Sequence, residues 1–276
     1  KPLSGESITE IKNLIENEDF ISGEGKEQKT PLLEDYQTEI KSKINLKRTL
    51  KIVLDCGNGA GGSVAPKLFK DLGIELIELY SEVDGNFPNH HPDPGNPENL
   101  KDLIVKVREN KAHLGIALDG DADRLGVVDN KGNIIFPDQY MSLIADQILK
   151  NNSGRKIVFD VKCSSKLKES ISKSKGVPIM TRTGHSFIKE EILKQNAILG
   201  GEMSGHIFFA DEYYGFDDAF YAAIKVIELI IINKSQFILD LTYFGSITKL
   251  MNTYVLKGWL YLVLFCIVSC LEAKLG

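Results

Sequence analysis

The sequence lacks the features of several specialised protein classes. Its four cysteines are widely spaced and form no C-x-x-C pair, so they indicate neither a structural zinc site nor a disulfide framework. The formal net charge of −5 at pH 7 argues against a nucleic-acid-binding protein, which would carry a basic face. The pattern of a secretory signal, a basic segment followed by an apolar one, is not seen. These features favour a cytoplasmic protein with no nucleic-acid partner.

Apolar runs long enough for a membrane span are also missing. Residues 260–270 carry no charge, but the stretch is shorter than the roughly 20 residues that a transmembrane helix needs. We therefore expect no membrane partner. The 276 residues are 43% hydrophobic and 26% charged, which is typical of a globular protein with room for two domains.

The most informative stretch is D-G-D-A-D-R at residues 119–124. It lies between two apolar runs that are typical of buried strands, so Asp119, Asp121 and Asp123 are expected on a tight loop at a strand end. Three carboxylates so close together repel one another unless a cation offsets their charge. Oxygen ligands favour Mg²⁺, Ca²⁺ or Mn²⁺, and Mg²⁺ leaves positions open for water and phosphate. Arg124 is the residue type expected to face a phosphate group.

Three other kinds of structure can contain such a stretch. An EF-hand loop needs glycine at its sixth position and glutamate at its twelfth, where this chain has Arg124 and Asn130, so that class is excluded. An aspartyl-phosphate phosphatase, which also carries D-x-D after a strand, stays open as a weaker alternative. A solvated acidic turn is the least favoured, because a turn seldom needs three alternating aspartates before an arginine.

Two further patterns suggest sites that we do not expect. Residues 57–62 contain G-x-G-x-x-G after a predicted strand, but glycines that allow a tight strand-to-helix turn explain them better than a dinucleotide site. His90, His91 and Asp93 resemble metal ligands, yet the prolines around them indicate a rigid loop.

The alternation of strand and helix patterns predicts layered α/β domains. Polar residues recur at the ends of the predicted strands, where open α/β sheets bind ligands. Two α/β domains of similar plan are therefore expected to meet at a shared cleft. Residues 18–30 are polar and contain almost no apolar residue, so they are expected to form a linker.

A second chemical motif is E-M-S-G-H at residues 202–206. If this segment is extended, Glu202, Ser204 and His206 face the same way and can hydrogen-bond adjacent sugar hydroxyls. The unperturbed pKa of histidine is close to neutrality, which makes it a residue type suited to proton transfer. A polar strand edge is the alternative. Asp217 and Asp218 are interpreted as charges at a helix N-terminus.

Taken together, residues 118–126, 182–186 and 201–206 resemble the α-D-phosphohexomutases, the family of bacterial phosphomannomutases and phosphoglucomutases. The resemblance covers residues 1–232. It implies two three-layer α/β/α domains with mixed sheets, and isomerisation of hexose 1- and 6-phosphates through a Mg²⁺-bound phosphoserine and a bisphosphate intermediate. The implied roles are Mg²⁺ ligands at Asp119, Asp121 and Asp123, catalysis by Arg124 and His206, and substrate binding by Lys162, His185, Glu202 and Ser204.

The resemblance also implies an organisation into parts of four domains. Residues 1–30 would be the tail of a first domain and a linker, 31–136 the second domain with the metal loop, 137–235 the third with the sugar loop, and 236–276 a divergent remnant of the last. No T-A-S-H-N-P-like serine loop occurs, so we expect a chain truncated at both ends and inactive alone. A separate chain carrying the missing domains would complete it. The alternative is a non-catalytic Mg²⁺- and sugar-phosphate-binding remnant or a decaying gene product.

Overall fold

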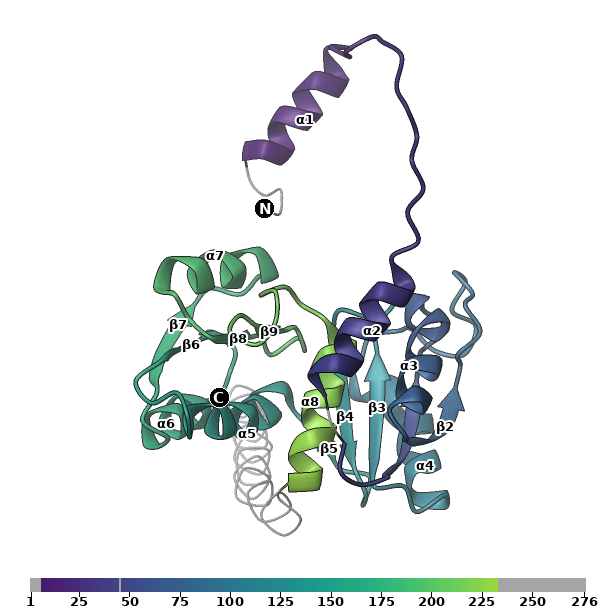
Figure 1. Ribbon diagram of the computed structural model, residues 1–276, viewed down its shortest axis with the longest axis vertical. Helices are drawn as coiled ribbons and strands as arrows, with labels where there is room; N and C mark the ends of the chain where they lie inside the picture. The colour runs from purple at the N-terminus through teal and green to yellow at the C-terminus, as the bar shows by residue number, and fades with distance from the viewer. Residues whose placement is uncertain (1–5, 45, 233–276) are drawn as a thin grey trace, which may run out of the picture. The chain divides into compact units, whose positions relative to one another are not determined.

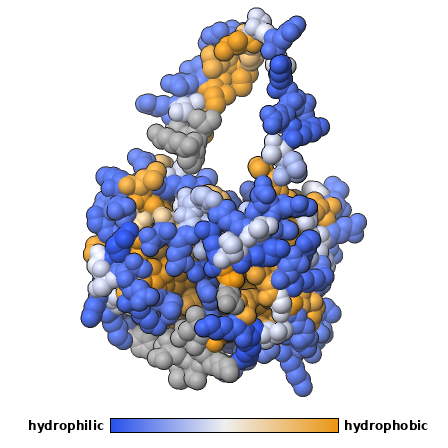
Figure 2. All heavy atoms as spheres, in the orientation of Figure 1, coloured by the Kyte–Doolittle hydropathy of each residue, from blue (hydrophilic) through white to orange (hydrophobic). Residues whose placement is uncertain are grey.

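A computed structural model describes residues 6–44 and 46–232 (Figure 1). The first helix, α1 (Glu6–Glu16), has no buried residue. Ile8 and Ile15 of this helix are exposed, and Figure 2 shows apolar residues along α1. The stretch that follows, up to α2 (Leu33–Lys43), contains no helix or strand, and its role as a linker stays a prediction.

The first sheet has five strands in the order β2-β1-β3-β4-β5. β1 is parallel to both of its neighbours, β2 and β3, whereas β4 is antiparallel to β3 and β5, so the sheet is mixed. The strands are β1 (Lys51–Asp55), β2 (Glu75–Leu79), β3 (Leu114–Leu118), β4 (Leu125–Asp129) and β5 (Ile134–Ile135). The helical segments among them are η1 (Ala60–Ser63), α3 (Ala65–Asp71), η2 (Pro97–Leu100) and α4 (Lys101–Glu109).

The core of this part follows directly from its sequence pattern. All five residues of β3 are buried, as expected for a continuous apolar run in a sheet covered on both faces. Helix α4 places Leu103 and Val107, four positions apart and therefore on one helical face, against Val53 and Val128 of the sheet. Because β3 is held rigidly in this core, the loop that follows it has a fixed base.

The second sheet repeats the plan with four strands in the order β7-β6-β8-β9. Here β6 is parallel to β7 and β8, and β9 is antiparallel to β8. The strands are β6 (Lys156–Asp160), β7 (Val177–Thr181), β8 (Leu199–Gly201) and β9 (Ile207–Phe209). The helices are α5 (Pro137–Leu149), α6 (Ser165–Lys173), α7 (His185–Gln195) and α8 (Ala219–Ile232).

Helices cover both faces of this second sheet. Ile188 and Ile192 of α7 pack against Val158 and Phe208, and Figure 1 shows α5 and α6 on the opposite side. The predicted α/β fold with two mixed sheets is confirmed. The sheets are built from residues 51–135 and 156–209, while the predicted domain limits stay a prediction.

The C-terminal remnant predicted at 236–276 lies outside the described residues. Within the described ranges, no helix is long and apolar enough to cross a membrane.

Candidate active site

The two loops singled out by the sequence meet in the structure. Residues 119–124 connect β3 to β4, and residues 202–206 connect β8 to β9. The backbone N–H of Leu125, at the start of β4, donates to the carbonyl of Gly205 over 3.1 Å. Gly205 has a φ of 106°, and a Cβ atom there would lie 2.9 Å from the carbonyl oxygen of Leu125. Glycine is therefore required where the second loop approaches the first.

The loop after β3 is wound around Asp119. This side chain is 2% exposed, and its Oδ1 accepts hydrogen bonds from the backbone N–H groups of Asp123 and Arg124. Asp119, Asp121 and Asp123 each offer one carboxylate oxygen, and these oxygens lie within 4.8 Å of one another. Such an all-oxygen set fits Mg²⁺, with Asp119 buried, Asp121 exposed and Asp123 half-buried.

Arg124 is held by two carboxylates. Its Nε donates to Oδ2 of Asp119 over 2.6 Å, and its Nη1 donates to Oδ1 of Asp93 over 3.0 Å. Asp93 thus orients the arginine, a role that the sequence did not reveal.

The glycine-rich turn at residues 57–62 packs beneath the same loop. The backbone N–H of Ala60 donates to the carbonyl of Gly120 over 2.9 Å, and a Cβ at Gly59 would lie only 2.7 Å from that oxygen. This close backbone approach explains the glycine without a dinucleotide.

The prediction that residues 202–206 are extended is wrong. They form the turn of the β8–β9 hairpin, closed by a hydrogen bond from the N–H of Glu202 to the carbonyl of His206 over 3.0 Å. Antiparallel neighbours need a reversal between them, so the alternation that suggested a common face does not apply. Glu202 is buried, and its carboxylate accepts hydrogen bonds from the N–H of Gly184 and the hydroxyl of Ser204.

His206 lies between carboxylates from the two halves of the site. Its Nδ1 is 3.1 Å from Oδ2 of Asp217 and 3.5 Å from Oδ1 of Asp123 in the metal loop. The ring of His185 stacks on that of His206 with centroids 5.6 Å apart. Lys189 pairs with Oδ1 of Asp217 over 2.6 Å. The structure therefore brings His185 and His206 together beside the aspartate triad.

The two aspartates before α8 have different surroundings. Asp218 accepts a hydrogen bond from the N–H of Tyr221 in the first turn of α8, which confirms its predicted place at the helix N-terminus. Asp217 instead faces the two histidines, so the same interpretation is wrong for its side chain.

The pKa values within this cluster are shifted. Burial raises the pKa of Asp123 to about 6; His206 opposes the shift, whereas Asp119 and Asp121 add to it. Burial alone would lower the pKa of His206, but its contact with Asp217 and the charge of Asp123 raise it. Burial alone would raise the pKa of Asp217, yet His206 and Lys189 hold that pKa below the usual range. A proton in this cluster is thus stabilised on His206 near neutral pH.

A buried carboxylate that the sequence did not single out organises the second half of the site. Asp160, at the end of β6, is fully buried. It accepts hydrogen bonds from the hydroxyl of Thr183 and the backbone N–H of Met203, and from the thiol of Cys163. It therefore links three loops at one strand end. Lys162 is exposed beside it, and no ion pair or hydrogen bond found in the described part of the chain joins Lys162 to the histidine cluster.

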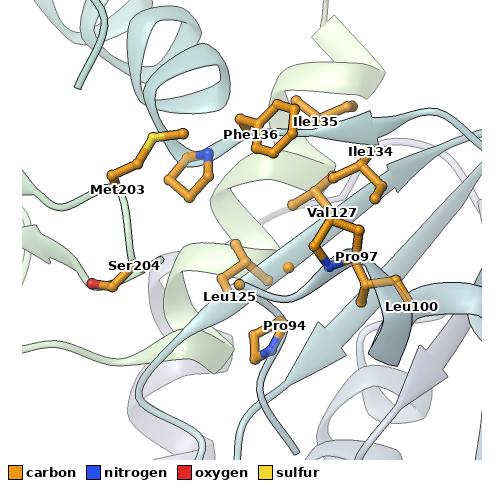
Figure 3. Close-up of a pocket in the computed structure, with 13 residues that line it drawn as sticks. Pro94, Pro97, Leu100, Leu125, Val127, Ile134, Ile135, Phe136, Met203 and Ser204 are labelled. Carbon is orange, nitrogen blue, oxygen red and sulfur yellow. The ribbon is translucent and has the colours of Figure 1, made fainter. Parts of the chain in front are cut away.

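An apolar cavity of about 130 Å³ lies next to the hairpin (Figure 3). Met203 and Ser204 line one side, and Pro94, Leu125 and Phe136 are among the residues across from them. The cavity is smaller than the roughly 300–1,000 Å³ of most ligand pockets, and it excludes the charged groups described above. It does not suit a sugar phosphate.

Comparisons with known proteins agree on one family. Residues 34–132 match the model described as phosphoglucomutase/phosphomannomutase, alpha/beta/alpha domain II, and residues 136–241 match the model of domain III.

Individual relatives share both sequence and structure with the chain. A phosphomannomutase/phosphoglucomutase from Pseudomonas syringae pv. tomato is 50% identical over 228 residues, covering 83% of this chain and 49% of the relative. A phosphoglucomutase from Neisseria gonorrhoeae is 46% identical over 230 residues, covering 83% and 50%. A crystal structure of a family protein from Burkholderia thailandensis superposes with a TM-score of 0.81 at 44% identity, covering 83% of this chain and 50% of that one. The chain thus spans about half the length of the curated relatives it matches.

Proposed function

Because the chain belongs to the phosphoglucomutase/phosphomannomutase family of α-D-phosphohexomutases, we propose that it supplies the metal loop and the sugar loop of an enzyme that interconverts hexose 1-phosphates and 6-phosphates. The observation that carries the proposal is the meeting of residues 119–124 with residues 202–206 through the Leu125–Gly205 hydrogen bond. This contact supports the proposal because it brings the loop proposed to bind a cation beside groups proposed to hydrogen-bond a sugar.

On this proposal, Mg²⁺ is held by Asp119, Asp121 and Asp123. When bound, it would offset the negative charge that develops on a transferring phosphoryl group. Arg124 would add a second positive charge at the same place. Since Asp93 and Asp119 already fix the guanidinium, Arg124 would meet the phosphate without losing much conformational freedom.

The sugar would be recognised by Glu202 and Ser204. Their mutual hydrogen bond of 2.9 Å leaves acceptor capacity on the oxygens of both side chains, to which sugar hydroxyls would donate. His185 and Lys162 would contact the substrate as well. His206 would hold or release the proton of the reacting hydroxyl, because its position between Asp123 and Asp217 stabilises its protonated form.

We propose that the two domains span residues 31–136 and 137–235 and that the protein is cytoplasmic. We also propose a phosphoserine mechanism that proceeds through a bisphosphate sugar. The 276 residues contain no T-A-S-H-N-P-like serine loop, so the nucleophile would come from a separate chain or another part of the enzyme. The second candidate is a non-catalytic module that binds Mg²⁺ and sugar phosphate.

Calorimetric titration of the 276-residue chain with Mg²⁺ tests the metal assignment. We expect weak binding, because the phosphoserine oxygen that would complete the coordination is missing, and we expect Asp121→Asn to abolish it. Asp121 suits the test because it is exposed, so the substitution leaves the fold intact. Asp211→Asn, an exposed carboxylate in another loop, is the matched control. Unchanged Mg²⁺ affinity in Asp121→Asn would show that the assignment is wrong.

A further inference from the structure

A second set of ligand atoms lies beside the aspartate triad. Asp123, His206 and Asp217 offer two carboxylate oxygens and one imidazole nitrogen, all within 4.8 Å of one another. These residues come from the loop after β3, the β8–β9 hairpin and the segment before α8. Only Asp123 also belongs to the triad.

The spacing of these atoms is that of a transition-metal site. In a tetrahedral zinc site with bonds of about 2.0–2.1 Å, neighbouring ligand atoms lie about 3.4 Å apart. Nδ1 of His206 is 3.1 Å from Oδ2 of Asp217 and 3.5 Å from Oδ1 of Asp123. A cation could therefore bind all three with little movement of the protein.

Two of the three ligand atoms are buried and unsatisfied. Nδ1 of His206 and Oδ2 of Asp217 face each other at 3.1 Å without hydrogen-bond geometry, and neither forms a hydrogen bond with any described residue. The Asp217 side chain is 7% exposed, and its other oxygen pairs with Lys189, which leaves Oδ2 directed at the imidazole. Buried polar atoms without partners are costly, and a metal ion would satisfy both. Asp123, with 30% of its side chain exposed, gives access from solvent.

We propose that Asp123, His206 and Asp217 form a second cation site, selective for zinc-class transition metals. Imidazole nitrogen favours such ions over Mg²⁺, which prefers oxygen ligands. Water would complete the coordination. Because Asp123 is shared with the aspartate triad, the second ion competes with Mg²⁺ for it. It also occupies Nδ1 of His206 and so excludes a proton from that atom.

Cobalt(II) is the probe, since it occupies zinc sites and its visible absorption reports coordination by nitrogen and oxygen. Titration of the 276-residue chain with Co²⁺ should produce saturable visible bands, and excess Zn²⁺ should abolish them. His206→Gln and Asp217→Asn should each weaken Co²⁺ binding by about 100-fold, because removing even an outer-sphere partner of a metal site costs 10- to 100-fold. His91→Gln and Asp211→Asn, both exposed, are the matched controls and should bind Co²⁺ as the unsubstituted chain does.

A third variant separates this proposal from the Mg²⁺ assignment. Asp121→Asn should lose Mg²⁺ binding and keep the Co²⁺ bands, since Asp121 belongs only to the triad. Co²⁺ bands that disappear in Asp121→Asn but survive in both His206→Gln and Asp217→Asn would overturn the second site and place Co²⁺ in the triad. The absence of any visible bands in the unsubstituted chain would overturn it as well. Circular dichroism of each variant shows whether the fold is retained.

Discussion

Replacement of Gly205 by alanine should loosen the contact between the two loops of the site. Gly205 has a φ of 106°, outside the region that residues with a Cβ adopt comfortably. Its added Cβ would lie 2.9 Å from the carbonyl oxygen of Leu125 and 3.1 Å from its backbone nitrogen. Both atoms are backbone, so relief requires the hairpin or the start of β4 to move.

The cost can be worked out from three contributions. A left-handed conformation costs a residue with a Cβ about 1–2 kcal/mol. Moving the hairpin weakens the hydrogen bond from Leu125 to Gly205, which is worth about 1 kcal/mol. Alanine also lowers the conformational entropy of the unfolded chain, which stabilises the folded protein by about 0.5 kcal/mol. The free energy of unfolding should therefore fall by about 2 kcal/mol.

Gly154→Ala is the matched control. Gly154 also has a positive φ, 81°, but a Cβ there meets no atom within 4 Å. Gly154→Ala should lower the free energy of unfolding by only about 1 kcal/mol, which is the conformational strain minus the effect of alanine on the unfolded chain. Urea unfolding followed by circular dichroism gives both values. Equal losses in the two variants would refute the claim that the close approach to Leu125 matters.

Three other predictions concern the sugar loop, pH and turnover. Glu202→Gln should weaken sugar-phosphate binding in calorimetry while leaving Mg²⁺ binding nearly intact; parallel loss of both would indicate unfolding instead. The side-chain contact of His90 with buried Asp55, 3.0 Å long, raises the pKa of His90 to about 9. The contact should stabilise the protein by about 2 kcal/mol after solvent screening; this contribution should be complete below about pH 6.5 and lost as the pH rises through 9. Urea unfolding at a series of pH values measures this dependence, and His90→Gln should abolish it. A coupled assay with glucose 1-phosphate, Mg²⁺ and a bisphosphate activator should show only background activity for the 276-residue chain.

The strands and helices could be predicted because their patterns are local. The apolar runs on either side of residues 119–124, predicted as buried strands, form β3, Leu114–Leu118, and β4, Leu125–Asp129. Both lie inside sheets, where a continuous apolar run bounded by turn residues is distinctive. In contrast, E-x-S-x-H at 202–206 has a period of two in a turn, where that period has no structural meaning.

The contacts that assemble the site could not be predicted because they join distant residues. Asp93 and Arg124 are 31 positions apart, and Asp160 and Met203 are 43 apart, so no local period links them. One signal was nevertheless present. Strands β1 and β6 both read K-I-V-x-D. Each ends in a buried aspartate, Asp55 or Asp160, that accepts hydrogen bonds from neighbouring loops. The repeated aspartate reflects the shared plan of the two sheets.

The expected lack of turnover rests on the surroundings of the serines near the site. The proposed mechanism needs a phosphorylated nucleophile, its cation and arginine, and a clamp on the distal phosphate, and candidate residues are proposed only for the second. Ser204 donates to Glu202 within the hairpin, and Ser164 caps α6 by accepting from the N–H of Lys166, so neither hydroxyl is positioned as a nucleophile. Loss of a catalytic nucleophile costs about 10⁶-fold in subtilisin. Turnover above background that Asp121→Asn abolishes would therefore mean that another serine of this chain attacks the phosphate.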